Sequence, residues 1–390
     1  MNTRMINDCP VKIWTDMVDR KAMEQIANLT TLPFLFHHLA IMPDVHAGKG
    51  MPIGGVLACQ DAVVPNAVGV DIGCGMCAVK TNYKVSHIHD SVMRKQIMRA
   101  IRARIPLGKD HHKEAQDSKY LPEGHDIDKM IIVKQRQDSI KKEVGTLGGG
   151  NHFIELQRDT NDNLWIMIHS GSRNLGARVG EYYNHMAEQL NERWHSVVPA
   201  NIHLAFLPCG TREFGLYWLE MKYCIDFALC NRRLMMLRIE EVLTDVLKNI
   251  EFEPMINIAH NYAANEMHFG NHVFVHRKGA TLAEEGTIGI IPGSMGTASY
   301  IVEGMGNTQS FKSCSHGAGR LMSRTEAIRS LNLKDEVDRL DAQGIVHGIR
   351  NQSDLQEAPS AYKNIDTVIA NEADLVRVKE KLLPVAVIKG

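Results

Sequence analysis

The sequence predicts an α+β fold, with a mixed or antiparallel β core flanked by helices. Apolar stretches of strand length and longer stretches of helical periodicity occur in blocks, which favours this class over a doubly wound parallel sheet. No internal repeat, low-complexity tract or long Pro/Gly/Ser linker divides the 390 residues, of which 44% are hydrophobic. Such a chain can bury a large core, so we predict one continuous domain over residues 1–390.

Short apolar stretches bounded by Gly, Pro, Asn or Asp are typical of strands. They predict strands at residues 39–42, 53–58, 164–168, 255–258 and 287–291. Residues 152–170 predict a hairpin with its polar turn at 161–163. Apolar residues recur at helical spacing elsewhere and predict helices over residues 90–105, 175–194, 214–250 and 366–382.

The charge balance excludes a strongly basic protein, because 44 Lys and Arg stand against 45 Asp and Glu. Any nucleic-acid surface must therefore be local. The first ten residues lack a secretory signal pattern, and no apolar run is long enough for a membrane span, so we expect a cytoplasmic protein with no membrane partner. In that compartment eight cysteines are better interpreted as free thiols or metal ligands than as disulfides.

A glycine-rich loop follows an apolar stretch at residues 68–77 and carries Asp71 and Cys74. Such a loop lets the backbone come close to an ion, while a carboxylate and a thiolate supply anionic ligands. A tight turn with a buried free cysteine would explain the same pattern equally well. Cys74 and Cys77 also form a CxxC, which is a weak indication of redox or zinc chemistry when no second pair accompanies it.

Three histidines, His152, His169 and His260, stand at predicted strand ends beside small or polar residues. A lone histidine of this kind is more often a hydrogen-bonded structural residue. Together with Asp71 and Cys74, however, the three have the ligand types of a dinuclear site in which a thiolate could bridge two metals. Two close metals can neutralise a triphosphate and orient an in-line displacement, so this set favours phosphoryl transfer.

Three glycine-rich segments, residues 145–150, 292–296 and 316–319, lack the spacing of a Walker A loop or a dinucleotide fingerprint. Each alone is more often a turn, but together they could present backbone N–H groups to phosphates. Cations stand near them or after apolar stretches, at Arg173, Lys278, Arg320 and Arg324. A further basic run between residues 94 and 104 is explained by a solvated helix face, and it could also extend an RNA track.

Read together, these motifs resemble the RtcB family of RNA ligases. The matching strings follow the family order over almost the whole chain: MPDVHAGKG (42–50), VGVDIGCGM (68–76), GTLGGGNHFIE (145–155), HSGSR (169–173), HNY (260–262), RKGA (277–280), IIPGSMG (290–296), CSHGAGR (314–320), AYKNID (361–366) and the final KG (389–390). The chain is thus identified as a member, and a short one, of that family.

The resemblance implies an enzyme of RNA repair or tRNA splicing. Members join an RNA 3'-phosphate, or a 2',3'-cyclic phosphate that is first opened, to a 5'-hydroxyl, with GTP and two Mn²⁺ ions as cofactors. An archease-type activator often assists them. By affinity order alone a Cys/His/Asp set would favour zinc, so manganese is an implication of the family only.

The resemblance also assigns roles to residues. It makes His316 the nucleophile that carries GMP, and it places Asp71, Cys74, His152, His169 and His260 on the metals, with Cys74 as the bridge. Glu155 and Lys389 would select guanine. The implied nucleotide site comprises Asn151, His152, Phe153, Ile154, Glu155, His260, Asn261, Pro292, Gly293, Ser294, Met295, Ser299, His316, Gly317, Ala318, Gly319 and Lys389. The implied contacts to RNA or phosphate are Arg173, Lys278, Arg320 and Arg324.

Two features depart from the family pattern. Residues 106–144 form a short segment rich in His and Lys, which bears on RNA preference, and Cys77 replaces an expected non-cysteine residue. Three other functions fit part of the pattern. A dinuclear metal phosphoesterase would need the metal ligands without His316, an RNA-end-binding protein would be catalytically silent, and a CxxC redox protein would not need the histidines.

Overall fold

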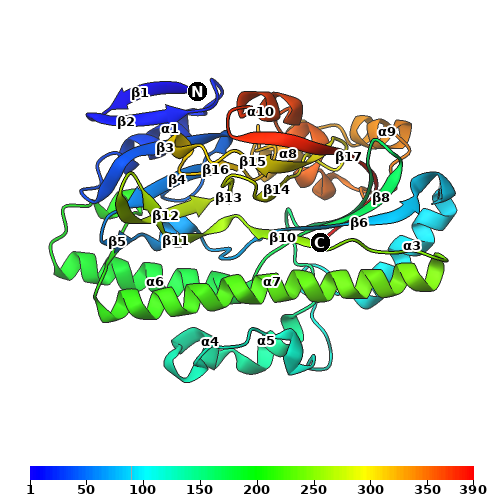
Figure 1. The fold of residues 1–390 in the computed structure, drawn as a ribbon, viewed down its shortest axis with the longest axis horizontal. Helices are drawn as coiled ribbons and strands as arrows, with labels where there is room; N and C mark the ends of the chain where they lie inside the picture. Colours follow the sequence, from blue (N-terminus) through cyan, green and yellow to red (C-terminus); the bar gives the residue numbers. More distant parts are fainter. Residues whose placement is uncertain (89) are drawn as a thin grey trace.

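The computed structural model describes residues 1–88 and 90–390 and confirms the α+β class. Two β-sheets form the upper part of the molecule, and two long helices run side by side beneath them (Figure 1). Within the described ranges, no helix combines the length and the apolar character that crossing a membrane requires.

The first sheet has six strands in the order β1-β2-β3-β4-β12-β11. Only the β2–β3 pair is parallel, and helix α1 (Arg20–Leu29) makes the crossover that a parallel pair requires. Ile26 and Leu29 of α1 pack against Ile13 and Ile41 of the sheet. The strands are β1 (Asn2–Ile6), β2 (Cys9–Ile13), β3 (Leu35–His46), β4 (Ile53–Cys59), β12 (Asn271–Lys278) and β11 (Asn261–His268).

The second sheet has seven antiparallel strands in the order β10-β6-β8-β7-β17-β15-β14. Its register sets Gly75 opposite Ser170 and Phe153 opposite His169, so the start of β6, the end of β8 and the start of β7 share one edge. The strands are β10 (Ile256–Ala259), β6 (Gly75–Lys84), β8 (Asn163–Ser170), β7 (Phe153–Arg158), β17 (Val376–Lys389), β15 (Ser299–Gly304) and β14 (Ile288–Ile291).

Two short pairs complete the β structure, β5 (Ala62–Val63) with β9 (Leu207–Pro208) and β13 (Ala280–Leu282) with β16 (Ser313–Ser315). The remaining helices are α2 (Pro65–Val68), α3 (Ser91–Arg104), α4 (Ile131–Gln135), α5 (Gln137–Glu143), α6 (Arg173–Arg193), α7 (Arg212–Val246), α8 (Arg324–Ser330), α9 (Leu333–Ala342) and α10 (Ile365–Asn371).

Helix α7 is buried along two faces. Met235, Ile239 and Leu243 pack against Ile154 and Ile168 of the seven-stranded sheet. Earlier turns of the helix pack against α6 and α4, and α4 and α5 lie on the side of α7 away from the sheets (Figure 1). This central position explains why the helix is long and largely apolar: it must cover both a sheet and neighbouring helices.

The sequence-based strand predictions are confirmed, because the five predicted segments coincide with or overlap β3, β4, β8, β10 and β14. The predicted hairpin is β7–β8, and its turn is held by the Asp159 carboxylate, which accepts hydrogen bonds from the backbone N–H groups of Asn161 and Asn163 at 2.9 Å each. The helices predicted over residues 90–105, 175–194 and 214–250 correspond to α3, α6 and α7.

The helix predicted over residues 366–382 is wrong in its larger part. Helix α10 ends at Asn371, and the chain then forms β17 from Val376 to Lys389. Alternating Val376-Arg377-Val378-Lys379 fits a pleated strand, and Pro384, at a register shift in the pairing with β7, cannot lie inside a helix. Pairing with both β7 and β15 outweighs the local helical pattern.

Glu220, a buried residue of α7, holds the start of helix α4 in place, and this contact can be tested. Its carboxylate accepts hydrogen bonds from the N–H groups of Ile131 and Val133 at 2.7 and 2.9 Å and from the Tyr183 hydroxyl at 2.7 Å. We predict that Glu220→Ala lowers the free energy of unfolding by about 3 kcal/mol, because charge-assisted bonds are lost and amides stay buried without an acceptor.

Denaturant unfolding would measure this change, and hydrogen exchange would show faster exchange at residues 131–133. Glu181→Ala, at an exposed position of α6, is the matched control and should change stability by less than about 0.5 kcal/mol. Unaltered exchange at residues 131–133 in Glu220→Ala would contradict the capping role.

Candidate active site

Three predicted metal ligands meet at the shared edge of the seven-stranded sheet. The Cys74 sulfur lies 3.4 Å from His152 Nε2 and 3.3 Å from His169 Nε2, and all three side chains are buried. Their ligand atoms lie within 4.8 Å of one another, close enough to hold one metal ion. The strand register produces this cluster, since Cys74 precedes β6, His152 precedes β7 and His169 ends β8.

Backbone carbonyls fix the orientation of the histidine rings. His152 Nδ1 lies 3.0 Å from the Leu147 carbonyl oxygen, and His169 Nδ1 lies 3.2 Å from that of Asn151. If each Nδ1 carries the proton and donates it, each Nε2 keeps a lone pair directed at Cys74, which is the tautomer that binds metal. Burial also lowers the pKa of His169 well below its usual value, which keeps this imidazole neutral.

His260 extends the cluster. Its ring centroid lies 5.2 Å from that of His169, and its backbone N–H donates to the Cys74 carbonyl at 2.8 Å. Burial, reinforced by His316, lowers the pKa of His260 well below the usual range, and among the described residues its buried Nδ1 has no hydrogen-bond partner. A neutral imidazole with a buried free nitrogen fits a metal ligand.

Asp71 stands at the solvent side of the cluster. One carboxylate oxygen lies 3.3 Å from His152 Nε2, and the Asp71 backbone carbonyl accepts from Cys74 N–H at 3.1 Å in a tight turn. Burial opposes ionisation, but the neighbouring His152 lowers the pKa of Asp71 overall, whereas burial and the Asp71 charge raise the pKa of the Cys74 thiol well above normal. Metal binding would therefore have to expel the Cys74 proton.

His316 lies next to this cluster and is held by a residue from the other sheet. Its ring centroid is 4.8 Å from that of His260, and its Nδ1 lies 2.6 Å from a carboxylate oxygen of Asp44. The same Asp44 oxygen accepts from the His316 backbone N–H at 3.1 Å. Burial alone would raise the pKa of Asp44, but the neighbouring His316 lowers it, so this fully buried carboxyl group stays ionised.

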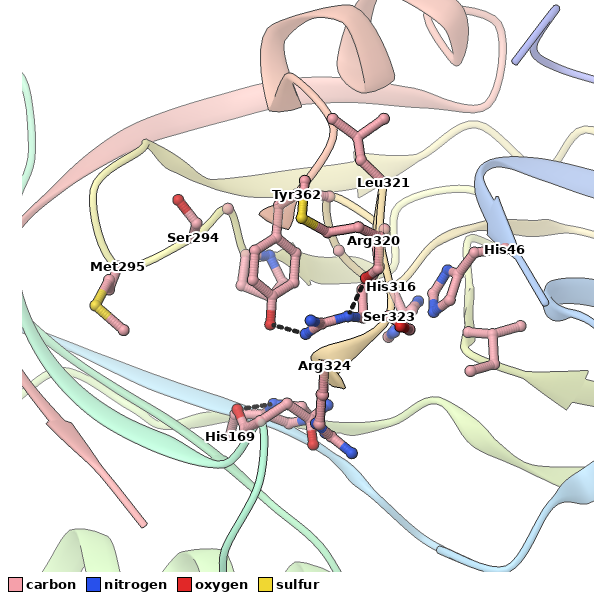
Figure 2. Close-up of a pocket in the computed structure, with 18 of the residues that line it drawn as sticks. His46, His169, Ser294, Met295, His316, Arg320, Leu321, Ser323, Arg324 and Tyr362 are labelled. Carbon is pink, nitrogen blue, oxygen red and sulfur yellow. Dashed lines mark hydrogen bonds between the residues drawn. The ribbon is translucent and has the colours of Figure 1, made fainter. Parts of the chain in front are cut away.

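His316 and His169 line a cavity of about 570 Å³, a size that suits a nucleotide (Figure 2). Its walls come from both sheets and from the loops after β14 and β16. Twelve of the predicted nucleotide residues line it: Asn151, Phe153, Glu155, Pro292, Gly293, Ser294, Met295, His316, Gly317, Ala318, Gly319 and Lys389.

The other predicted nucleotide residues surround the cavity without lining it. His152 belongs to the Cys/His cluster, His260 lies beside it, and Ile154 faces the hydrophobic core. The Asn261 side chain donates to the Asp71 carbonyl at 3.1 Å and accepts from Gly279 N–H at 2.7 Å, so it joins two loops. The Ser299 hydroxyl accepts from Gly293 N–H at 3.3 Å and positions the loop that follows β14.

Glu155 and Lys389 are brought together by the pairing of β7 with β17, in which Glu155 is opposite Val387 and Phe153 is opposite Lys389. Burial raises the pKa of Glu155 to about 7, although Lys389 and a 2.7 Å hydrogen bond from Gln157 oppose the shift. Burial also lowers the pKa of Lys389, whose ammonium lies 4.9 Å from the Phe153 ring centroid. A hydrogen-bond acceptor, Glu155, and a donor, Lys389, thus lie near each other at the cavity.

The four predicted phosphate-binding cations separate into two groups. Arg320 and Arg324 line the cavity and share the carboxylate of Glu357, at 3.3 and 2.8 Å, and Arg320 also lies against Tyr362 (Figure 2). Arg173 and Lys278 do not line it. Arg173 donates to the Gly108 carbonyl and to Thr146 at 2.8 Å each.

Lys278 donates to two backbone carbonyls, those of Lys49 at 2.6 Å and Asn66 at 3.0 Å. Its ammonium is therefore used inside the protein, and burial lowers the pKa of Lys278 to about 7.

Residue-type reasoning missed three side chains that shape the site. Asp44 stands in the string MPDVHAGKG, where no role was assigned to it. On α7, Asn231 accepts from the N–H groups of Gly145 and Thr146 at 2.7 and 3.0 Å, and Arg232 donates to the carbonyls of Gly73 and Ser170 at 3.0 and 2.8 Å. Two fully buried polar residues in a largely apolar helix are the signal that could have revealed this pair.

Cys77 lies in the hydrophobic core, and its CxxC partner Cys74 belongs to the histidine cluster. Both thiols are free, and Cys77 packs among the residues between the seven-stranded sheet and α7. Burial raises the pKa of Cys77 to about 12, so it is not a reactive thiolate. A dithiol redox centre is therefore a poor interpretation of this pair.

Comparison with known proteins gives a consistent result. The family model described as tRNA-splicing ligase RtcB matches residues 25–136 and 115–390. The chain is 38% identical to proteins named RNA-splicing ligase RtcB1 and RNA-splicing ligase RtcB from two strains of Escherichia coli, over 98% of both chains in each case. It is 30% identical to the tRNA-splicing ligase RtcB of Thermococcus kodakarensis, over 96% of this chain and 92% of the relative.

Metal titration tests the cluster. We predict that Co²⁺ added to the metal-free protein produces a thiolate-to-cobalt charge-transfer absorption, because Cys74 is the ligand nearest to both histidines. Cys74→Ser should abolish that absorption, whereas Cys77→Ala, which alters a core thiol, should retain it. Binding that rises with pH would agree with loss of the Cys74 proton, whereas an absorption that survives Cys74→Ser would rule out this cluster as the site.

Proposed function

The chain belongs to the RtcB family of RNA-splicing ligases, and from this premise we propose that it joins RNA 3'-phosphate or 2',3'-cyclic phosphate ends to 5'-hydroxyl ends with GTP, through a His316–GMP intermediate. The observation that carries the proposal is the His316–Asp44 pair, which lies between the nucleotide-sized cavity and the Cys/His cluster. A phosphoesterase would need the cluster alone. We also propose that residues 1–390 form one catalytic unit.

The nucleophile in this proposal is the Nε2 atom of His316. In this arrangement Nδ1–H donates a hydrogen bond to the Asp44 carboxylate, so Nε2 keeps its lone pair. Attack on the α-phosphorus of GTP forms an N–P bond and breaks the bond to the β-phosphate oxygen, which leaves as pyrophosphate. The imidazole of the adduct carries positive charge, and the ionised Asp44 beside it stabilises that charge.

Two further transfers complete the reaction. An oxygen of the RNA 3'-phosphate attacks the phosphorus of GMP and breaks the N–P bond, which frees His316 and gives an RNA end activated by GMP. The 5'-hydroxyl then attacks the 3'-phosphorus and expels GMP as the strand is sealed. We infer that Arg320 and Arg324, which line the cavity, hold the RNA phosphates, whereas Arg173 and Lys278 act by holding loops.

Cys74, His152 and His169 could hold one metal ion, and we infer that Asp71 and His260 beside them complete a site for two, which the family resemblance implies are Mn²⁺. When bound, such ions would withdraw charge from the triphosphate and orient it for in-line displacement. The protein contributes the rest of the arrangement: the carbonyls of Leu147 and Asn151 fix the imidazole tautomers, and Asn231 and Arg232 hold the loops that carry the ligands.

Guanine selectivity follows from Glu155 and Lys389. The carboxylate can accept from guanine N1–H and N2–H₂, while the ammonium can donate to O6, and adenine offers neither set. Glu155 is buried and Lys389 is half-buried, so a mismatched base would leave Glu155 with only its bond from Gln157 and would offer no acceptor to Lys389. The Pro292–Met295 and Gly317–Gly319 loops line the rest of the nucleotide site.

The partners in this proposal are RNA 3'-phosphate or 2',3'-cyclic phosphate ends and 5'-hydroxyl ends. An archease-type activator and a cytoplasmic location remain predictions. Which cleaved RNA is the natural substrate depends on surfaces outside the nucleotide cavity.

Adduct formation is the direct test. Full-length protein incubated with Mn²⁺ and α-labelled GTP should acquire a label that is labile in acid and stable in alkali. His316→Ala should abolish labelling, and Asp44→Asn should slow it by about 10²- to 10⁴-fold, because the amide cannot stabilise the charged ring. His37→Ala, at an exposed histidine of β3, is the matched control. Equal labelling of wild type and His316→Ala would rule out the ligase mechanism.

Base selectivity gives an independent prediction. Glu155→Gln should reduce the preference for GTP over ATP in adduct formation by about 10²-fold, because one acceptor oxygen is replaced by a donor. Lys389→Met should also reduce it, while Glu285→Gln, an exposed change, should leave it unchanged. The measurement is the ratio of labelling rates, and a ratio that does not change in either pocket variant would place guanine elsewhere.

A further inference from the structure

A basic groove of about 780 Å³ lies at the end of α3 and along the segment that follows it. Its lining includes Arg102, Lys109, His111 and Lys113, all of which are exposed. Among the described residues, no ion pair engages Arg102, Lys109 or Lys113, whereas the neighbouring Arg104 is paired with Glu241 and Asp245. Asp110 is the acidic residue of the lining. Free positive charge is therefore concentrated here in a chain of net charge -1.

The groove is connected to the nucleotide cavity by glycine backbone. Gly108 N–H donates to the Gly148 carbonyl at 3.1 Å, and a side-chain carbon built on Gly149 would lie 3.7 Å from Gly108 Cα. One built on Gly150 would lie 3.2 Å from an Arg324 guanidinium nitrogen. The surface from the groove to Arg324 thus passes Gly108, Gly149 and Gly150, with Gly390 beside the first two, and Arg324 is half-exposed and lines the cavity. Without side chains, a bulky strand can pass close to the protein.

We propose that this groove binds the sugar-phosphate backbone of the RNA strand whose end enters the cavity. The inference rests on the ligase function proposed above and adds the path of the substrate. Separate, unpaired cations along a groove suit a chain of phosphodiesters, because each ammonium or guanidinium can neutralise one phosphate. The His- and Lys-rich segment that follows α3 forms one wall of the groove.

The test compares two triple variants of the full chain. The groove variant carries Arg102→Gln, Lys109→Gln and Lys113→Gln. The control variant carries Arg4→Gln, Arg193→Gln and Arg212→Gln, three exposed cations outside any described ion pair. The control positions belong to β1, the end of α6 and the start of α7, which lie at the opposite end of the molecule from α3 (Figure 1).

Fluorescence anisotropy would measure binding of a labelled RNA of about 20 nucleotides with a 3'-phosphate, from about 50 to 200 mM salt. We expect the groove variant to bind at least about tenfold more weakly and its salt slope to fall by about 2, since each phosphate contact on a single strand contributes about 0.7. A trinucleotide with the same end, confined to the cavity, should bind both variants equally well.

Each outcome decides one point. Equal affinity of the groove and control variants for the long RNA would overturn the proposal and leave a solvated surface. Weaker binding of the trinucleotide to the groove variant would also overturn it, since it would indicate a general structural effect, as would a thermal midpoint lowered by more than about 4 °C. Failure of the wild-type protein to form the GMP adduct would instead contradict the ligase function. The comparison of RNA binding between the two variants would still test the groove independently.

Discussion

The contact between Asp44 and His316 joins two sheets that otherwise contribute separate parts of the site. Asp44 comes from β3 of the six-stranded sheet, and His316 follows β16 and faces the histidines of the seven-stranded sheet. Burying a carboxylate here is costly, and the His316 ring and backbone N–H, with the nearby charge of Lys363, offset part of that cost. Lys363 donates to the carbonyls of Pro43 and Val45 at 3.1 and 2.6 Å, which fixes the strand on both sides of Asp44. Gly319, with a φ of 74°, lies where any side chain would strike the Asp44 carbonyl.

Residue types and motif spacing predicted much of the site. Cys74, His152 and His169 could be proposed as ligands because soft and imidazole donors stood at the ends of predicted strands, and the structure brings these three together. Local patterns also placed the long helices. They failed at residues 372–382, because pairing of β17 with strands on both sides outweighs the local helical pattern. Glu155 and Lys389 lie near each other because β7 pairs with β17. The sequence alone therefore indicated their proximity only through the family resemblance.

Support from behind the site was the least predictable part. Asn231 and Arg232 lie on α7, which is otherwise largely apolar. Their role depends on which loops cross that helix. The two side chains satisfy backbone groups in three loops that carry ligands or border the cavity. Glycine-rich loops are conformationally costly to order, and hydrogen bonds from a rigid helix offset part of that cost. Helix α7 thus helps to fix the loops around the Cys/His cluster.

The position of β17 has a consequence for how the protein is made. This strand holds residues 376–389 yet lies in the interior of its sheet, between β7 and β15. During synthesis, β7 and β15 are complete long before β17 emerges. Until then, one edge of each strand and much of the apolar surface that β17 will cover stay open. The seven-stranded sheet should therefore be completed late in folding, because its interior strand pairs with segments that lie far from it in the sequence.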